Sequence, residues 1–186
     1  MNEEFPFTDT VASLPVTVPF VGPEALERRY GRTFRARLGA NESAFGVSPL
    51  ARDAMCRAVD RAAWYCDPEC FELQAALARH HAVDPDQISI AAGIDEILGL
   101  AVRMFVSPGE PVVTSYGAYP TFNYHVHGFG GHLVTVPYAD DREDPRALVD
   151  LAAACGAHLL YLANPDNPMG TWNEADEIRR AVKRLP

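Results

Sequence analysis

The segment from His158 to Trp172 reads HLLYLANPDNPMGTW, and a side-chain amide is its most distinctive group. Asn167 follows an apolar run and stands between Pro165 and Pro168. Proline fixes its own φ and biases the preceding residue towards extended backbone, so this amide is held in one direction. An amide donates to an oxyanion and accepts from a hydroxyl, and it therefore suits a ligand's phenolate or carboxylate oxygen. The alternative is a rigid turn that tolerates asparagine for its backbone conformation.

Two other segments could also meet a ligand. Gly93 stands between a predicted strand and a predicted helix, where the unpaired amides of Ile94 and Asp95 and the helix dipole favour a phosphate. Glycine also occurs at such turns for steric reasons, and Asp95 is itself a good partner for the dipole. Tyr116 ends the next predicted strand, where its ring could stack on a flat ligand or pack against a helix.

The elements that would position these groups alternate between strand and helix. The predicted strands are 88–93, 111–116, 132–138 and 158–164, and the predicted helices are 94–106, 119–129, 144–155 and 171–184. Such alternation favours an α/β fold with a mostly parallel sheet and flanking helices. Ligands of these sheets bind outside the carboxyl ends of the strands, so all three segments are expected at one edge.

The first part of the chain is less regular. Residues 1–22 are proline-rich and predict an arm, which a short helix from Pro23 and a short strand over 34–38 follow. Ser48 and Pro49 begin a helix that is expected to reach Ala63, and another covers 70–81. We expect 1–47 to form the arm and the start of a small domain, and 48–186 to form part of a larger, incomplete domain.

Composition narrows the function classes. The chain has 186 residues, is 48% hydrophobic and 22% charged, and carries a net charge of -9. That charge argues against a nucleic-acid partner. No apolar run is long enough for a bilayer, and the acidic N-terminus lacks the features of a signal peptide, so we expect a cytoplasmic protein with reduced cysteines.

Several polar clusters are expected to be ordinary. Cys66 and Cys70, with His80 and His81 further on, lack the second close pair that a zinc site requires. His125 and His127 are two residues apart on a helix and are expected to point away from each other. The acidic run DDRED, which spans 140–144, predicts a solvated loop that ends in a helix cap.

Five short motifs, taken together, resemble those of fold-type I pyridoxal-phosphate aminotransferases (class I/II), histidinol-phosphate aminotransferases in particular. ANPDNPMG is similar to the N-P-x-N-P-x-G signature, and GANESAFG to N-E-N-P-[YF]-G. WYCDPE, AAGIDEIL and TSYGAY resemble Y-P-D-P, G-[SA]-D-E and P-T-Y-x-x-Y. The order and approximate spacing agree over nearly the whole chain, which makes the combination specific.

The resemblance implies a role for each matching residue. Asn167 would bind the phenolic oxygen of pyridoxal 5'-phosphate, Tyr116 would stack on its ring, and the amides of Ile94 and Asp95 would hold its phosphate. Tyr65 would reach the cofactor phosphate of a partner subunit, since the family forms homodimers with shared sites. Asn41 would lie near the substrate carboxylate. The implied reaction moves an amino group between an amino acid or amino-alcohol phosphate and a 2-oxo acid.

The catalytic groups of the family lie further along the chain than this sequence reaches. They include the Schiff-base lysine and the acid that pairs with the pyridine nitrogen, whereas Lys183, the single lysine here, is on a helix and is expected to be solvated. We therefore expect the N-terminal half of an enzyme, inactive on its own. A decarboxylase or C–S lyase of the same fold, a non-catalytic remnant or binding module, and a nucleotide-binding α/β protein remain alternatives.

Overall fold

The computed structural model describes residues 6–15, 20–39 and 41–185. Residues 1–5 and 16–19 of the predicted arm, and Ala40 of the GANESAFG motif, lie outside the described residues. The chain forms two compact units, one of residues 1–20 and 92–186 and the other of residues 21–91. This division differs from the predicted boundary after residue 47, which remains a prediction about the domains of the complete protein.

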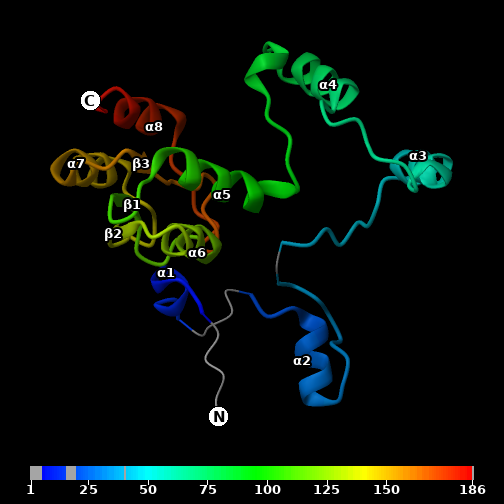
Figure 1. Ribbon diagram of the computed structural model, residues 1–186, viewed down its shortest axis with the longest axis horizontal. Helices are drawn as coiled ribbons and strands as arrows, with labels where there is room; N and C mark the ends of the chain where they lie inside the picture. The colour runs from blue at the N-terminus through cyan, green and yellow to red at the C-terminus, as the bar shows by residue number, and fades with distance from the viewer. Residues whose placement is uncertain (1–5, 16–19, 40, 186) are drawn as a thin grey trace. The chain divides into compact units, whose positions relative to one another are not determined.

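A parallel sheet lies at the centre of the first unit (Figure 1). Its strands are β1 (Pro111–Ser115), β2 (His132–Val136) and β3 (Leu159–Leu160), in the order β2-β1-β3. Val113 is in register with Val134 of β2 and with Leu160 of β3. The prediction of a parallel sheet is confirmed, although β3 is shorter than the predicted strand 158–164.

Helices cover both faces of this sheet. On one face, α5 (Gly93–Phe105) and α6 (Pro120–Gly128) pack with β1 around a buried apolar cluster. On the other face, α7 (Pro145–Cys155) packs against all three strands, and α8 (Ala175–Val182) packs against α7. The short helix α1 (Asp9–Ala12) contacts α6. Coverage of both faces explains why the strands are apolar at consecutive positions.

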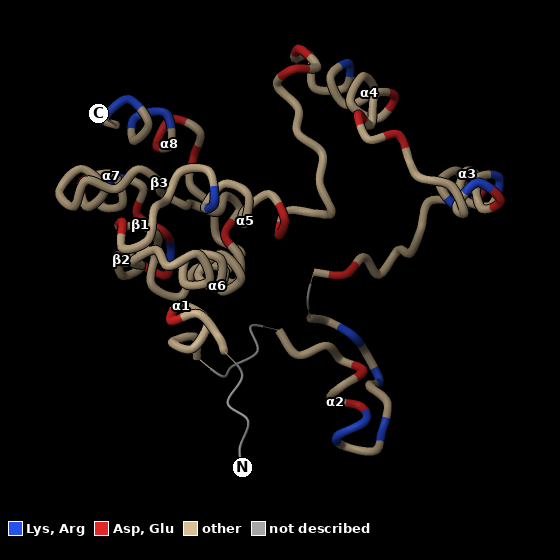
Figure 2. The backbone as a smooth tube through the Cα atoms, viewed as in Figure 1, with Lys and Arg blue, Asp and Glu red and all other residues tan. Residues whose placement is uncertain are grey.

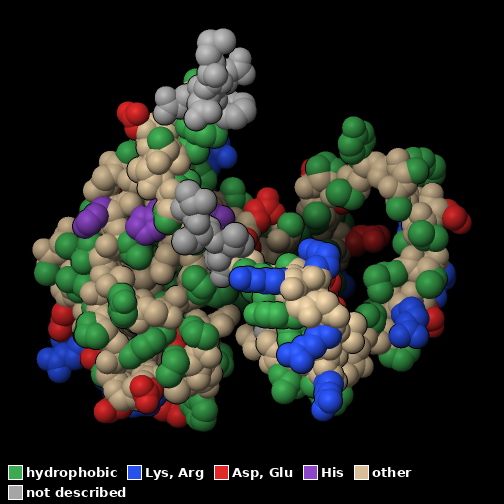
Figure 3. Space-filling view, turned by 90° about the horizontal axis from the view of Figure 1, so that it is seen from below, with side chains coloured by type: hydrophobic (Ala, Val, Ile, Leu, Met, Phe, Trp, Pro, Cys, Tyr) green, Lys and Arg blue, Asp and Glu red, His purple; other side chains and the backbone are tan. Residues whose placement is uncertain are grey.

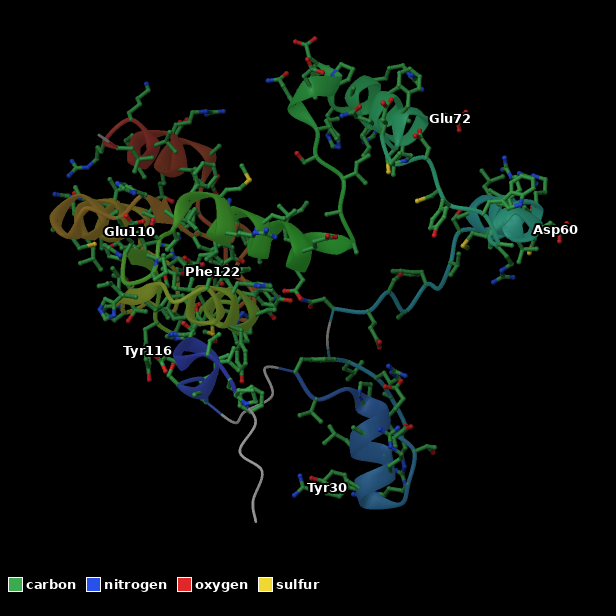
Figure 4. The ribbon with its side chains drawn as sticks, in the orientation of Figure 1. Tyr30, Asp60, Glu72, Glu110, Tyr116 and Phe122 are labelled. Carbon is green, nitrogen blue, oxygen red and sulfur yellow. The ribbon has the colours of Figure 1, made fainter. Side chains whose placement is uncertain are left out.

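Aromatic stacking strengthens the cluster between α6 and the sheet. Phe122 is 1% exposed, and its ring stacks on that of Tyr161 with centroids 4.4 Å apart and an interplanar angle of 19°. Figure 4 shows Phe122 within the packed interior of this unit. Burial of one such side chain contributes about 1.5–3 kcal/mol, so Phe122 is a principal anchor of α6 on the sheet.

The prediction for residues 88–106 is only partly correct. Residues 88–92 form no strand in the described part of the chain, and α5 already begins at Gly93. Leu98 and Val102 of this helix are buried, whereas Ile94, Met104 and Phe105 are exposed. Large apolar side chains lie on the surface of both units (Figure 3).

The N-caps of α7 and α8 differ in how well the sequence predicts them. Asp144 is the N-cap of α7, as predicted, and its carboxylate accepts from the amides of Arg146 and Ala147. The helix predicted over 171–184 begins later, at Ala175. The N-cap of α8 is Glu174, which forms a capping box with Glu177, while the Thr171 hydroxyl donates to the Asp141 carbonyl at 3.3 Å.

The regular elements of the second unit are helices, and the rest of its described residues are irregular. Its helices are α2 (Pro23–Tyr30), α3 (Pro49–Ala58) and α4 (Phe71–His81), with short 3-10 turns at Val59–Arg61 and Pro85–Gln87. The predicted strand over 34–38 is absent, and this arginine-rich segment is instead irregular (Figure 2). Arg37 pairs with Glu24 and Glu42.

Two findings concern membrane-spanning helices and disulfide bonds. Within the described residues, every helix is too short or too polar to cross a bilayer. All four cysteines are free thiols.

Candidate functional site

Tyr116 lies where the central strand ends. β1 finishes at Ser115, and the Tyr116 amide donates to the Val136 carbonyl of β2 at 2.7 Å. The side chain is 75% exposed and lies at the periphery of its unit (Figure 4). The ring is therefore accessible to a ligand, and stacking on a flat ligand stays a prediction.

The loop after β3 uses its two asparagine amides differently. Asn164 is bonded to the backbone of Asn173 in both directions, with its Oδ1 accepting at 2.8 Å and its Nδ2 donating at 3.2 Å. The Asn167 side chain is half-buried and has no hydrogen-bond partner among the residues that the structure describes. The first amide therefore holds the loop together, whereas the second is available to a ligand.

The backbone of this loop is closed at its base. The Asp166 amide donates to the Thr171 carbonyl at 2.7 Å, and the Gly170 amide donates to the Asp166 carbonyl at 3.0 Å. Gly170 has φ 72°, in the left-handed region that glycine tolerates best. The peptide bonds that precede Pro165 and Pro168 are both cis. Two closing hydrogen bonds and two prolines together fix the position of Asn167.

The first turn of α5 offers free amide donors. Gly93 has φ 82°, and a side chain there would meet open space, so its backbone conformation rather than crowding accounts for the glycine. The first amides of a helix have no carbonyl of their own helix to bind, which leaves those of Ile94 and Asp95 for an anion. The Glu96 carboxylate reaches back to the Ala92 amide at 2.6 Å.

A histidine links this first turn to α6, the helix that follows Tyr116. His125 Nε2 lies 3.1 Å from Asp95 Oδ1. A Cβ on Gly99 would approach Cε1 and Nδ1 of the His125 ring to 2.8 Å, so only glycine leaves room for the imidazole against α5. His127 is exposed, as expected for two histidines that are two residues apart on a helix. The Asp95 carboxylate is thereby drawn towards the imidazole.

Sequence reasoning missed Glu143, which it assigned to a solvated loop. Glu143 is 2% exposed. Its carboxylate accepts from the Ser115 hydroxyl at 2.9 Å and from the Ala163 amide at 3.1 Å. Burial raises the pKa of Glu143, and the neighbouring Asp166 raises it further, while the two donors act in the opposite direction. The DDRED run gave no signal of this burial, because the donors lie 28 and 20 residues away.

Two half-buried tyrosines, Tyr138 and Tyr161, lie near Glu143 and Asp166. Burial raises the pKa of Tyr138, with the charge of Asp166 as a further cause. Burial likewise raises the pKa of Tyr161 to about 12, and Glu143 contributes to that shift. Both phenols are therefore neutral at physiological pH and serve as packing groups with a polar end.

Four of the six predicted site residues belong to the same unit. Tyr116 and the Asn167 loop follow neighbouring parallel strands, and the first turn of α5 contacts the helix that follows Tyr116. The other two, Asn41 and Tyr65, belong to the second unit. Asn41 has φ 53°, in the left-handed region, and Tyr65 is fully exposed.

The donors of the first unit fit the cofactor that the motifs imply. Helix amides suit a phosphate, an exposed aromatic face suits a flat ring, and an unpartnered amide suits an anionic ring oxygen. The orphaned amide of Asn167 is the most specific of these features, because its neighbour Asn164 is fully used within the protein.

Known proteins are similar to this chain in sequence and in fold. Histidinol-phosphate aminotransferase 2 of Nitrosospira multiformis is 36% identical over 149 residues, which are 80% of this chain and 38% of the relative. The histidinol-phosphate aminotransferase of an Anaeromyxobacter species is 35% identical over 180 residues, which are 95% of this chain and 48% of the relative. The chain therefore spans half or less of the length of these relatives.

A solved structure extends the likeness to the whole chain. The histidinol-phosphate aminotransferase of Sinorhizobium meliloti, solved in complex with pyridoxal-5'-phosphate, is 51% identical and superposes with a TM-score of 0.93. The match covers 100% of this chain and 49% of that one. The predicted fold, the α/β fold of fold-type I aminotransferases, is confirmed. A family model described as aminotransferase class I and II matches residues 36–185, and the chain belongs to this family.

Proposed function

We propose that the first unit holds pyridoxal 5'-phosphate, and that the complete protein is a histidinol-phosphate aminotransferase-like enzyme. It would transfer an amino group between an amino acid or amino-alcohol phosphate and a 2-oxo acid, in the cytoplasm. The observation that carries the proposal is the unpartnered Asn167 amide, held between two prolines in the loop that follows β3, the strand that pairs with β1. The likeness at 51% identity to a protein solved with this cofactor supports it.

Each residue of the site would have a distinct task. The amides of Ile94 and Asp95 would bind the phosphate, where the positive end of the α5 dipole adds to their hydrogen bonds. The Tyr116 ring would lie against one face of the pyridine ring and keep it in one plane. Asn167 would donate to the phenolic oxygen and stabilise its anionic form.

The bound cofactor supplies an electron sink for the carbanion that forms when a substrate loses its Cα proton. The chain's own contribution is to orient that ring. By holding the phosphate, the ring face and the phenolic oxygen at three separate points, it would leave the cofactor a single orientation. Tyr65 and Asn41 would act from the second unit, Tyr65 on the cofactor phosphate of a partner subunit in a homodimer and Asn41 near the substrate carboxylate.

The test is a titration of the complete gene product with pyridoxal phosphate, followed by visible absorbance. We expect saturable binding with a visible band, and we expect Asn167→Ala to change the pH dependence of that band. Tyr116→Phe keeps the aromatic face and is expected to bind normally, whereas Tyr116→Ala should weaken binding by about tenfold. A protein that retains no visible band after unbound cofactor has been removed would refute the assignment.

A further inference from the structure

Glu143 connects two strand ends through its carboxylate. The Ser115 hydroxyl at the end of β1 donates to Oε2, and the Ala163 amide beyond β3 donates to Oε1. Both oxygens of one buried carboxylate are therefore used to join segments that lie far apart in the sequence. Single hydrogen bonds of this kind are common, but a carboxylate that accepts from the end of β1 and from the segment after β3 fixes the separation of these two segments.

These two donors are immediate neighbours of the proposed cofactor-binding residues. Ser115 directly precedes Tyr116, and Ala163 directly precedes the loop that carries Asn167. The backbone carbonyl of Glu143 also accepts from the Asn173 side chain at 3.2 Å, and Asn173 is bonded to Asn164. Glu143 thus supports the loop from both of its ends.

Stability alone does not account for a carboxylate at this position. A buried carboxylate is costly, and its replacement by an apolar side chain of similar volume is often neutral or stabilising. The groups that face Glu143 add to this cost, because Asp166 is 7% exposed and its oxygens have no hydrogen-bond partner within the described residues. Burial and this second carboxylate both raise the pKa of Glu143. A role in placement explains the residue better.

We infer that Glu143 is a positioning residue of the cofactor site. Through Ser115 and Ala163 it holds Tyr116 and Asn167 at a fixed distance from each other. The inference rests on the proposed function, since it assigns Glu143 a role in that same site. Glu143 does not itself touch the cofactor. It acts by fixing the distance between the Tyr116 ring, which follows β1, and the Asn167 amide, which follows β3.

Two substitutions separate the hydrogen bonds from the charge. Glu143→Gln keeps the size and can still accept from the Ala163 amide, while its NH2 group donates to the Ser115 oxygen. Glu143→Leu removes both links. Leu148→Ala, on the buried face of α7, is the control, because it lowers stability without removing any of these hydrogen bonds.

The first measurement is hydrogen exchange of the protein without cofactor. Glu143→Leu is expected to accelerate exchange in residues 159–173, whereas Glu143→Gln should leave it close to that of the unaltered protein. The second is the dissociation constant of pyridoxal phosphate, together with the pH dependence of its visible band. We expect Glu143→Leu to raise the constant by about tenfold or more and to shift that pH dependence. Glu143→Gln should stay within about twofold.

The outcomes distinguish the two proposals. If the unaltered protein does not bind pyridoxal phosphate, the proposed function fails. If it binds, but Glu143→Leu retains the same affinity, pH dependence and exchange, Glu143 is not a positioning residue. An effect of Leu148→Ala on binding equal to that of Glu143→Leu would also overturn the inference, because stability would then explain both. Should Glu143→Leu not fold, Ser115→Ala removes one link, and unchanged binding in that variant would count against the role.

Discussion

The two asparagines of the loop after β3 should respond oppositely to the same substitution. Asn164→Ala removes the acceptor of the Asn173 amide, at 2.8 Å, and the donor to the Asn173 carbonyl, at 3.2 Å. An amide left without an acceptor costs about 1–3 kcal/mol, and the second hydrogen bond contributes about 1 kcal/mol. We therefore expect Asn164→Ala to lower the free energy of unfolding by about 2–4 kcal/mol.

Asn167→Ala should leave stability almost unchanged, because its side chain makes no hydrogen bond within the described residues. We expect a change of no more than about 0.5 kcal/mol in the free energy of unfolding. It should instead weaken cofactor binding, since a hydrogen bond to a charged oxygen contributes about 1.5–3 kcal/mol, or roughly tenfold to hundredfold in affinity.

Equilibrium urea unfolding and a pyridoxal phosphate titration of both variants provide the assay. The extrapolated free energies of unfolding give the stability effect, and the titration gives the dissociation constants. Equal losses of stability in the two variants would refute the division of labour between the two amides. A stable Asn164→Ala variant with impaired binding would reverse the assignment.

Three further predictions test other parts of the structure. Glu143→Gln should gain stability relative to the unaltered protein as pH rises. The pKa of Glu143 is raised in the folded protein, mainly by burial. The stability that protonated Glu143 contributes is therefore fully present below the pKa of the unfolded state and is lost as pH rises through the folded-state pKa, whereas the glutamine of Glu143→Gln does not titrate. Urea unfolding of both proteins between about pH 4 and pH 8 measures the sign of this difference. Gly99→Ala should destabilise the protein by about 1–2 kcal/mol, because the added Cβ clashes with the His125 ring. In a His125→Ala background the clash is absent, and Gly99→Ala should instead stabilise by about 1 kcal/mol through the higher helix propensity of alanine. Thermal unfolding of the two single variants and the double variant measures both effects. Asp144→Ala should cost about 1 kcal/mol through loss of the α7 cap, whereas Asp144→Asn, which also caps, should cost much less in the same assay.

The sheet and its covering helices could be predicted because their signals are local. Apolar runs separated by glycine and proline marked β1 and β2, and Asp144 before Pro145 marked the start of α7. A strand, however, also needs a partner that the sequence pattern does not identify. Residues 88–92 have the composition of a strand but form no strand pairing in the described part of the chain.

The features of the site that were missed depend on contacts between distant residues. His125 and Asp95 are 30 residues apart, and nothing in either segment indicates the other. Glu143 stands in an acidic run that resembles a solvated loop, and only the fold supplies its donors. Asn167 and Gly93 could be proposed as site positions from the sequence because proline and glycine restrict or release the backbone locally.

The most direct test of the account is a crystal structure of the complete gene product with pyridoxal phosphate. We expect the phosphate within hydrogen-bond distance of the Ile94 and Asp95 amides, the ring against Tyr116, and the phenolic oxygen at Asn167 Nδ2. A cofactor bound elsewhere, or bound here with the Asn167 amide turned away from its ring oxygen, would contradict the central claim.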